Sequence, residues 1–449
     1  MVVFMLKLRR KLALYMGKVA INISKLANRS GTAFPGKVAL TMDKHFLEEI
    51  NEKCEKIIIV TGTNGKTTTN NLINHVLKDN TLLSNLKGAN MIQGIATTYV
   101  KNTKNKYDYG IFEVDEGSLD RITKYIHPDY IILTNFFRDQ LDRYGEIEGI
   151  ISEVLNDIKK LPDTTLIINA DDAYVNQFKE VLPNKIITFG LNILDNNLDE
   201  KNLLLKKCPI CGNKINFLKH TYGHLGDYNC PKCGFNNLNK DFTVTKINHL
   251  DSSQKIMIKN NDTNYEINYP YIGIYNAYNV CGVFALTNEL GLDNQKTISS
   301  FEDFSFNLGR MEEFTYENKK IKVILTKNPI GLSQATKIIS NDSREKVVVH
   351  ILNDNPADGR DISWIWDANT YCTNDTQIKR YYCSGRRSEE IALKKKYDDV
   401  DVKIIVLYDN YEECINDAIK EEVEIIYVLP TYTAIFQTRD YINALVGGK

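Results

Sequence analysis

Near its N-terminal end the chain reads Ile57-Ile58-Ile59-Val60-Thr61-Gly62-Thr63-Asn64-Gly65-Lys66-Thr67-Thr68-Thr69, and this segment sets the expected architecture. The leading β-branched residues predict a buried strand, and the apolar helical pattern that follows predicts a helix over residues 66–77. Glycines between the two let successive backbone N–H groups face one anion. The helix dipole, a mobile Lys66 cation and a threonine hydroxyl for magnesium complete such a site. We therefore predict a nucleotide-binding phosphate loop formed by Gly62, Thr63, Asn64, Gly65, Lys66, Thr67 and Thr68.

Short β-branched runs alternate with helical patterns after this loop. Strands are expected at residues 56–61, 109–114, 130–134, 165–169 and 185–189. Such alternation builds βαβ units, which place parallel strands in one sheet with helices on both faces. A second block of this kind begins near residue 319, with strands expected at residues 321–325, 346–351, 377–382, 402–408 and 423–429. The sequence thus predicts an α/β protein with two α/β domains.

The composition is that of a globular protein without an overall charge bias. Of the 449 residues, 43% are hydrophobic and 25% are charged, with 56 Lys and Arg against 57 Asp and Glu. The whole molecule is therefore not a polyanion binder. The length exceeds one ordinary core, so we expect several segments: a basic segment over 1–44, a nucleotide-binding domain over 45–315 and a C-terminal domain over 316–449.

The N-terminal segment concentrates positive charge. Residues 1–42 contain eight basic residues and no acidic one. The charges run through the apolar residues, which is unlike a signal peptide, and no run of about 20 apolar residues predicts a membrane-spanning helix. A cytoplasmic location is expected. An amphipathic helix is predicted by the apolar set Leu6, Leu12, Val19, Ile23 and Leu26. Either this helix docks on the protein's own core, or its basic face lies on the inner face of an anionic membrane.

Four of the nine cysteines form two close pairs, Cys208-Pro-Ile-Cys211 and Cys230-Pro-Lys-Cys233, with 18 residues between them. Each pair offers two thiolates on one side, and two such pairs complete the tetrahedron that zinc prefers. Because all four ligands come from the protein, the predicted zinc ribbon, an insert over residues 204–240, is structural. Zinc ribbons also occur in nucleic-acid-binding modules, but this insert has no marked basic excess, so we expect a folding role and no nucleic acid partner.

Several motifs beyond the phosphate loop resemble the Mur-ligase superfamily, whose loop has the same short Gly-Thr-x-Gly-Lys-Thr form. They follow one another in the order typical of that superfamily: Glu113 at a strand end, Thr134-Asn135, Asp139-Gln140-Leu141-Asp142, Asn169-Ala170-Asp171-Asp172, Tyr275-Asn276-Ala277-Tyr278-Asn279 and Gly309-Arg310-Met311-Glu312. The resemblance implies an ATP-dependent carboxylate ligase with a central phosphate-loop domain, followed by a second, Rossmann-like domain.

The resemblance also assigns roles within the predicted ATP site. Lys66 and Glu113 are the expected catalytic residues of the central domain, and Thr67 and Glu113 would hold magnesium. Asn90, Asn276, Asn279 and Arg310 join the phosphate loop as expected ATP-binding residues, with the asparagine pair near the adenine and Arg310 toward the ribose. Making an amide from a carboxylate at neutral pH requires activation, which these enzymes achieve through an acyl phosphate.

A polar segment of the C-terminal domain narrows the resemblance. It reads His350-Ile-Leu-Asn-Asp354-Asn-Pro-Ala-Asp358-Gly-Arg360-Asp361-Ile-Ser-Trp364-Ile-Trp366-Asp367 and contains both tryptophans of the chain. Considered alone, it is typical of an acidic surface loop. Together with the ribbon, it resembles the MurT family, the Mur-ligase-like subunits of lipid II isoglutaminyl synthases.

That family implies an activity and a partner. Its members amidate the α-carboxyl of D-glutamate in the lipid II stem peptide to D-isoglutamine, with ammonia from a separate glutamine amidotransferase, GatD, in a heterodimer. The position matching the aspartate that supports the partner's Cys–His pair is Asp361, the third expected catalytic residue. A folylpolyglutamate-synthase-like ligase is the alternative within the superfamily. Two features weigh against it: the ribbon, and Lys327, which stands at the histidine of the Asp-x-x-His-Asn-Pro motif of related ligases.

Overall fold

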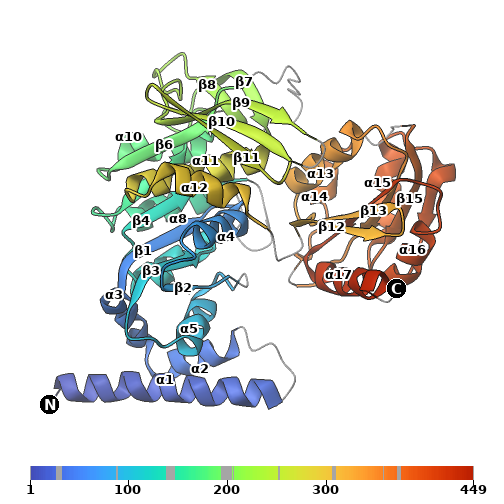
Figure 1. Cartoon of the computed structure of the whole chain (residues 1–449). Helices are drawn as coiled ribbons and strands as arrows, with labels where there is room; N and C mark the ends of the chain where they lie inside the picture. The colour runs from blue at the N-terminus through green and yellow to red at the C-terminus, as the bar shows by residue number, and fades with distance from the viewer. Residues whose placement is uncertain are drawn as a thin grey trace. The chain divides into compact units, whose positions relative to one another are not determined.

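The computed structural model describes residues 2–26, 33–86, 89–137, 147–193, 205, 207–250, 253–305, 310–356, 358–371 and 376–447. The chain divides into two compact units, with the boundary between Phe304 and Ser305 (Figure 1). The sequence-predicted boundary between the two large domains lies about one strand later in the chain. Each unit has its own sheet and its own core.

A nine-stranded sheet forms the centre of the first unit, in the order β11-β10-β9-β6-β5-β4-β1-β3-β2. The strands are β1 (Cys54–Thr61), β2 (Leu82–Ser84), β3 (Tyr107–Glu113), β4 (Tyr130–Leu133), β5 (Thr165–Asn169), β6 (Ile186–Leu191), β9 (Phe242–His249), β10 (Gln254–Asn260) and β11 (Thr263–Tyr269). From β6 to β2 all neighbours are parallel, whereas β9, β10 and β11 form an antiparallel extension. Strand β1 lies between β3 and β4, so the phosphate loop leaves from the middle of the sheet.

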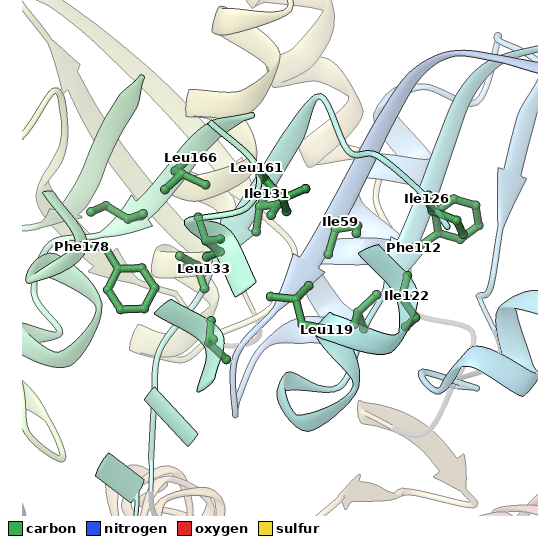
Figure 2. Packing of buried hydrophobic residues seen from close by; sticks show 14 of the residues in the cluster. Ile59, Phe112, Leu119, Ile122, Ile126, Ile131, Leu133, Leu161, Leu166 and Phe178 are labelled. Atoms are coloured by element: carbon green, nitrogen blue, oxygen red, sulfur yellow. The ribbon is translucent and has the colours of Figure 1, made fainter. Parts of the chain in front are cut away.

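The helices of this unit surround the sheet. They are α1 (Val2–Leu26), α2 (Phe34–Met42), α3 (Glu49–Lys53), α4 (Lys66–Val76), α5 (Ile92–Lys101), α6 (Leu119–Thr123), α8 (Ile147–Ile158), α9 (Ala173–Asn176), α10 (Phe178–Val181), α11 (Ile274–Glu289) and α12 (Asn294–Glu302). Most of them bury apolar residues of the sheet, while α1 packs on α2 and α5 (Figure 1). Figure 2 shows side chains of β1, β3 and β4 packed against α6, with Ile59, Phe112 and Leu119 fully buried. Each such side chain contributes about 1.5–3 kcal/mol of hydrophobic stabilisation.

The second unit contains a six-stranded sheet in the order β12-β13-β17-β14-β15-β16. Its strands are β12 (Arg310–Tyr316), β13 (Lys319–Ile324), β14 (Lys346–Ile351), β15 (Ile378–Ser384), β16 (Ile405–Leu407) and β17 (Ile425–Pro430), and its helices are α13 (Pro329–Asn341), α14 (Trp364–Asp367), α15 (Ser388–Tyr397), α16 (Tyr411–Ala418) and α17 (Tyr432–Gly447). Only β12 runs antiparallel to its neighbour. All six residues of β14 are buried, and four of them are Val or Ile, as expected for a central parallel strand.

The ten predicted strands are confirmed, with two local differences. Residues 402–404 form a short 3-10 turn, so β16 is restricted to Ile405–Leu407. Strand β2 is an edge strand of three residues that the sequence analysis did not predict. A three-residue edge strand lacks the run of β-branched residues that marked the central strands.

The N-terminal helix docks on the first unit, and two residues of the predicted apolar set, Leu12 and Ile23, do not take part in the docking. Leu12 and Ile23 are 45% and 53% exposed, whereas Ala13 and Ala20 are buried against the unit. Of the predicted apolar set, Leu12 and Ile23 thus face away from the core and Val19 is half-buried, while the side chains of Leu6 and Leu26 lie outside the described residues. Among the helices of the described ranges, none is long and apolar enough to cross a bilayer.

Candidate active site

The phosphate loop joins β1 to α4 in a shape that only glycine tolerates at two positions. Gly62 and Gly65 have φ angles of 117° and 87°. A Cβ atom at Gly62 would lie 2.4 Å from Thr134 Oγ1, and one at Gly65 would lie 2.4 Å from Asn279 Oδ1. The first N–H groups of α4 have no acceptor within the helix, and the helix dipole favours an anion there. The backbone therefore fits a bound phosphate chain, as predicted.

Asn135 holds the outer part of the loop in place. Its carbonyl accepts from Thr63 N at 2.7 Å, its Oδ1 accepts from Asn64 N at 2.9 Å, and its Nδ2 donates to Asn64 O at 3.1 Å. These bonds occupy the N–H groups of Thr63 and Asn64. The N–H groups at the start of α4 are therefore the better candidates for phosphate contacts.

Lys66 is buried, which differs from the mobile surface cation that the sequence suggested. Its Nζ lies 2.9 Å from Glu116 Oε2 and also donates to the carbonyl oxygens of Gly62 and Thr63. Burial lowers the pKa of Lys66, but the negative charges of Glu116, Asp115 and Glu113 more than offset this, and the net pKa is raised. Lys66 is thus a permanently charged cation inside the loop.

The predicted magnesium ligands Thr67 and Glu113 lie together. Thr67 Oγ1 donates to Glu113 Oε1 at 3.1 Å across the gap between α4 and the end of β3. Glu113 is 3% exposed, and its second oxygen, Oε2, is buried without a hydrogen-bond partner among the described residues. A buried carboxylate oxygen without a donor is costly unless a cation binds it. This unpartnered oxygen beside a threonine hydroxyl fits a magnesium site.

Asn276 and Asn279 approach the loop from the first turns of α11. Asn279 Oδ1 lies 3.4 Å from Thr69 Oγ1, while Asn279 Nδ2 and Asn276 Oδ1 are buried without hydrogen-bond partners among the described residues. One free donor and one free acceptor suit the edge of a purine base. The expected role of this asparagine pair near adenine therefore fits the geometry.

For two further residues of the predicted ATP site, Asn90 and Arg310, only backbone contacts can be described. Asn90 lies just before α5, and its carbonyl accepts from Asp115 N at 3.0 Å, which brings it to the segment that follows Glu113. Arg310 begins β12 in the second unit, where its backbone pairs with Ile324. Its side chain, Gly309 and the predicted motif at residues 139–142 lie outside the described residues.

The four cysteines of the insert converge on one point. Their Sγ atoms all lie within 4.8 Å of one another, with Cys208 to Cys233 at 3.7 Å and Cys211 to Cys230 at 3.5 Å. A tetrahedral zinc ion with bonds of about 2.3 Å separates its sulfur ligands by about 3.8 Å. Both loops turn through a glycine with positive φ, at Gly212 and Gly234. Donor type and spacing fit a structural zinc ion.

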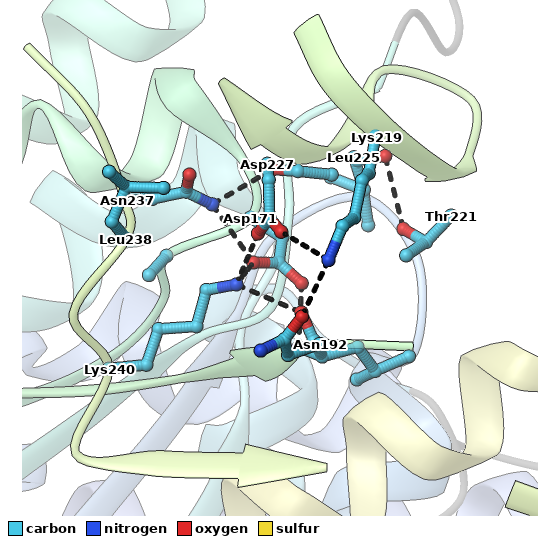
Figure 3. A network of polar contacts seen from close by, with 12 residues as sticks. Asp171, Asn192, Lys219, Thr221, Leu225, Asp227, Asn237, Leu238 and Lys240 are labelled. Atoms are coloured by element: carbon cyan, nitrogen blue, oxygen red, sulfur yellow. Dashed lines mark hydrogen bonds and ion pairs between the residues drawn. The ribbon is translucent and has the colours of Figure 1, made fainter. Parts of the chain in front are cut away.

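A buried polar network fixes this insert to the end of β5 (Figure 3). Asp171 is fully buried and lies 2.6 Å from Lys240 Nζ, which also contacts Asp227 at 2.7 Å. Asn237 Nδ2 and Tyr278 OH donate to the two oxygens of Asp171 at 3.0 and 2.7 Å. The hairpin of β7 (Asn216–Tyr222) and β8 (Leu225–Asn229) is thereby attached to the central domain.

The neighbouring Asp172 links the same hairpin to the loop that supports Asn135. Its Oδ2 accepts from Phe136 N at 2.6 Å, and its Oδ1 lies 3.2 Å from Nε2 of the buried His224 in the hairpin turn. The ribbon thus contacts the residues that follow β4, next to the phosphate loop. A folding role for the ribbon fits this position.

Replacing Cys208 by Ser should reduce folding yield before it reduces chemistry. Without its fourth thiolate the ribbon loses zinc, and the packing around Asp171 and Asp172 weakens. A loss of a few kcal/mol corresponds to a melting temperature about 5–10 °C lower. The check is metal analysis and a thermal melt, with Cys54→Ser as a control at a buried cysteine outside the ribbon. Wild-type protein without zinc, or an unchanged melt for Cys208→Ser, would contradict a structural zinc site.

Two aspartates of the C-terminal polar segment, Asp358 and Asp361, lie in different environments. Asp358 is buried and accepts from Thr433 N and Oγ1 at 2.7 and 2.5 Å, which anchors the segment to α17. Asp361 is exposed, and its Oδ1 accepts from Ser363 N at 2.8 Å just before α14. Asp358 is therefore structural, whereas Asp361 presents a positioned carboxylate at the surface of the second unit.

Sequence reasoning missed two residues that define the loop. Glu116 pairs with Lys66, and Asn135 holds residues 63 and 64; the sequence analysis gave neither residue a role, although Asn135 belongs to one of its motifs. The available signal was position: each follows directly after a central parallel strand, where functional side chains gather in α/β sheets.

Known proteins resemble this chain along its length. The Mur ligase middle domain model matches residues 60–208, and the MurT ligase C-terminal model matches residues 325–435. The lipid II isoglutaminyl synthase (glutamine-hydrolyzing) subunit MurT of Staphylococcus aureus strain COL is 33% identical over 446 residues, covering 98% of this chain and 100% of that protein. The protein of the same name from Streptococcus pneumoniae strain R6 is 35% identical over 419 residues, or 92% of each chain.

A solved structure agrees at the level of the fold. The pseudomurein peptide ligase type C from Methanothermus fervidus superposes with a TM-score of 0.67 at 19% identity, covering 88% of this chain and 80% of that one. The curated relatives add sequence similarity that runs through the phosphate-loop unit, the ribbon and the second unit alike. On this similarity, this chain belongs to the MurT family, within the ATP-dependent Mur ligases.

Proposed function

We propose that this chain is the ligase subunit of a lipid II isoglutaminyl synthase, which uses ATP to amidate the α-carboxylate of D-glutamate in the lipid II stem peptide. The observation that carries the proposal is the Thr67–Glu113 pair with its unpartnered buried oxygen, next to the charged Lys66. Such a site serves phosphoryl transfer, and relatives of this chain are named for the synthase. The product is D-isoglutamine.

The chemistry starts from a poor electrophile. A carboxylate oxygen attacks the γ-phosphorus of ATP, the bond to the β–γ bridging oxygen breaks, and ADP leaves with that electron pair. Ammonia then attacks the carbonyl carbon of the acyl phosphate, inorganic phosphate leaves, and the nitrogen loses a proton. Lys66 stabilises the charge that develops on the transferring phosphoryl group. Thr67 and Glu113 would hold magnesium, which neutralises phosphate charge.

Ammonia comes from a partner in this proposal. The relatives are named as glutamine-hydrolyzing and as a subunit, which supports a GatD-like glutamine amidotransferase in a heterodimer. Asp361 is the residue of this chain that we assign to that partner's active site. Its exposed carboxylate, held by Ser363 N, suits a group that orients a histidine ring and stabilises its charged form.

Replacing Asp361 by Asn separates the two nitrogen sources. The variant complex should keep ATP binding and amidation from ammonium chloride, yet lose amidation from glutamine by about 10²-fold or more, because the partner's base is no longer supported. Asp367→Asn, an exposed carboxylate of the same segment, is the matched control. Equal loss from both sources would place Asp361 in the ligase site, and no loss from either would leave it a surface residue.

The family assignment favours amidation over the folylpolyglutamate-synthase-like alternative. That alternative requires an amino acid as the nitrogen nucleophile, so product analysis with glutamate in place of ammonia decides between them.

We also assign the reaction to the cytoplasm. None of the eight cysteines that the structure describes forms a disulfide, as expected of a reducing compartment, and the ribbon's four cysteines must stay reduced to bind zinc.

A further inference from the structure

Helix α1 exposes four of its large apolar side chains, although Leu14 and Ile21 on its other side pack against the core of the first unit. Leu8, Leu12, Tyr15 and Ile23 are 59%, 45%, 64% and 53% exposed. At 100° per residue, these four side chains fall within an arc of about 80°. They extend over about 22 Å of helix. Single exposed apolar residues are ordinary on a protein surface, but four on one continuous arc mark an interaction surface. We call these residues the outer apolar arc.

The opposite side of α1 explains how this arc stays exposed. Small residues line the docking face: a Cβ atom at Gly17 would lie 2.9 Å from Val100 of α5 and 3.3 Å from Ala39 of α2. Ala13 and Ala20 are buried beside it. Close packing against α2 and α5 therefore fixes the rotation of the helix. The outer apolar arc cannot turn inward without separating these three helices (Figure 1).

Positive charge borders the arc. Lys11 and Lys18 lie along one edge, both exposed, and neither makes an ion pair within the described part of the chain. Arg9 lies along the other edge, where its Nε donates to Met42 O. No acidic residue occurs in residues 1–42. An apolar strip between basic residues, on a helix too polar to span a bilayer, is the pattern of a helix that lies in the headgroup region of an anionic membrane.

We infer that α1 docks the first unit onto an anionic lipid surface through the outer apolar arc, with Lys11 and Lys18 contacting lipid phosphates. This inference rests on the proposed function in one respect: a lipid-linked substrate lies in the membrane, so docking on the membrane would bring the enzyme to it. An exposed apolar strip bordered by lysines that make no ion pair within the described ranges is complementary to an anionic bilayer in both hydrophobicity and charge. Each lysine near an anionic surface strengthens binding about fivefold.

The test is sedimentation with vesicles that contain no lipid II, so that binding is measured without turnover. Vesicles of phosphatidylcholine mixed with phosphatidylglycerol are compared with vesicles of phosphatidylcholine alone. The wild-type chain should bind the anionic vesicles more tightly, and added salt should weaken that binding. Leu12→Glu/Tyr15→Glu and Lys11→Glu/Lys18→Glu should each reduce binding at least about tenfold. The exposed ribbon residues provide the matched controls Leu238→Glu and Lys232→Glu, which should bind like wild type.

Melting temperature and ATP binding should stay unchanged in all four variants, which shows that they are folded. Wild-type protein that fails to bind anionic vesicles, or arc variants that bind as wild type does, would overturn the inference. A chain that self-associates, and that Leu12→Glu/Tyr15→Glu converts to monomer without any vesicle binding, would also overturn it, because a second copy would then cover the arc. Loss of amidation alone, with vesicle binding intact, bears on the proposed function and not on this surface.

Discussion

Replacing Lys66 by Met should reduce ATP-dependent amidation by about 10²–10³-fold, the cost of removing one preorganised group that stabilises transition-state charge. Lys66 Nζ is held inside the phosphate loop by Glu116 and by two loop carbonyls, and the surrounding carboxylates raise its pKa, so the cation is present at every physiological pH. Methionine keeps the unbranched, flexible shape of most of the side chain but removes the ammonium group, with its charge and its hydrogen bonds. The measurement is turnover under saturating ATP, ammonium chloride and lipid II.

The burial of Lys66 requires a control for stability. Removing one partner of a buried ion pair leaves Glu116 as an uncompensated carboxylate, which costs about 3–5 kcal/mol. The double variant Lys66→Met/Glu116→Gln removes both charges and should recover most of the lost melting temperature. Its turnover should stay low. If the double variant regained near-normal turnover, the loss in Lys66→Met would be one of folding, and the argument for a catalytic cation would fail.

Replacing Glu113 by Gln should reduce turnover by about 10²-fold and raise the magnesium concentration needed for half-maximal rate about tenfold or more. The substitution keeps the shape of the side chain while removing the negative charge that a cation would meet at Oε2. The melting temperature should change little, because the amide oxygen can still accept from Thr67 Oγ1 and the carboxylate oxygen that lacks a partner among the described residues is removed. A magnesium titration of the initial rate measures both effects.

Thr67 supplies the matched control for this site. Thr67→Ser keeps the hydroxyl that donates to Glu113 Oε1 and should retain activity. Thr67→Val removes the hydroxyl at nearly constant volume and should resemble Glu113→Gln in its magnesium dependence. Unchanged magnesium dependence in both Glu113→Gln and Thr67→Val would remove this pair from the metal site.

Local patterns predicted those parts of the site that one segment of chain determines. The strand, the glycine turn and the helix around Lys66 depend on neighbouring residues only. The spacing of the four cysteines was enough to predict that they lie together as a zinc site. The pair Thr67–Glu113 depends on strand order, and the family resemblance supplied it. The close approach of Asn279 to Gly65 depends on the packing of α11, and the sequence analysis did not predict it.

Contacts between distant residues explain what the sequence did not reveal. The burial of Lys66 by Glu116 and the support of Asn64 by Asn135 join residues 50 and 71 positions apart. The face of α1 that docks could not be predicted either. Periodicity identifies an amphipathic helix, but it does not show that Gly17, Ala13 and Ala20 lie at the centre of the docking face while Leu8, Leu12, Tyr15 and Ile23 are exposed.

The central claim is that a carboxylate is activated by phosphoryl transfer in the Lys66–Glu113 site. It is tested most directly by labelling the D-glutamate α-carboxylate of lipid II with a heavy oxygen isotope and following the label during amidation. An acyl phosphate is cleaved at its carbonyl carbon, so the phosphate released should carry one labelled oxygen for each amide formed. Phosphate without label, at a normal rate of amide formation, would contradict the account.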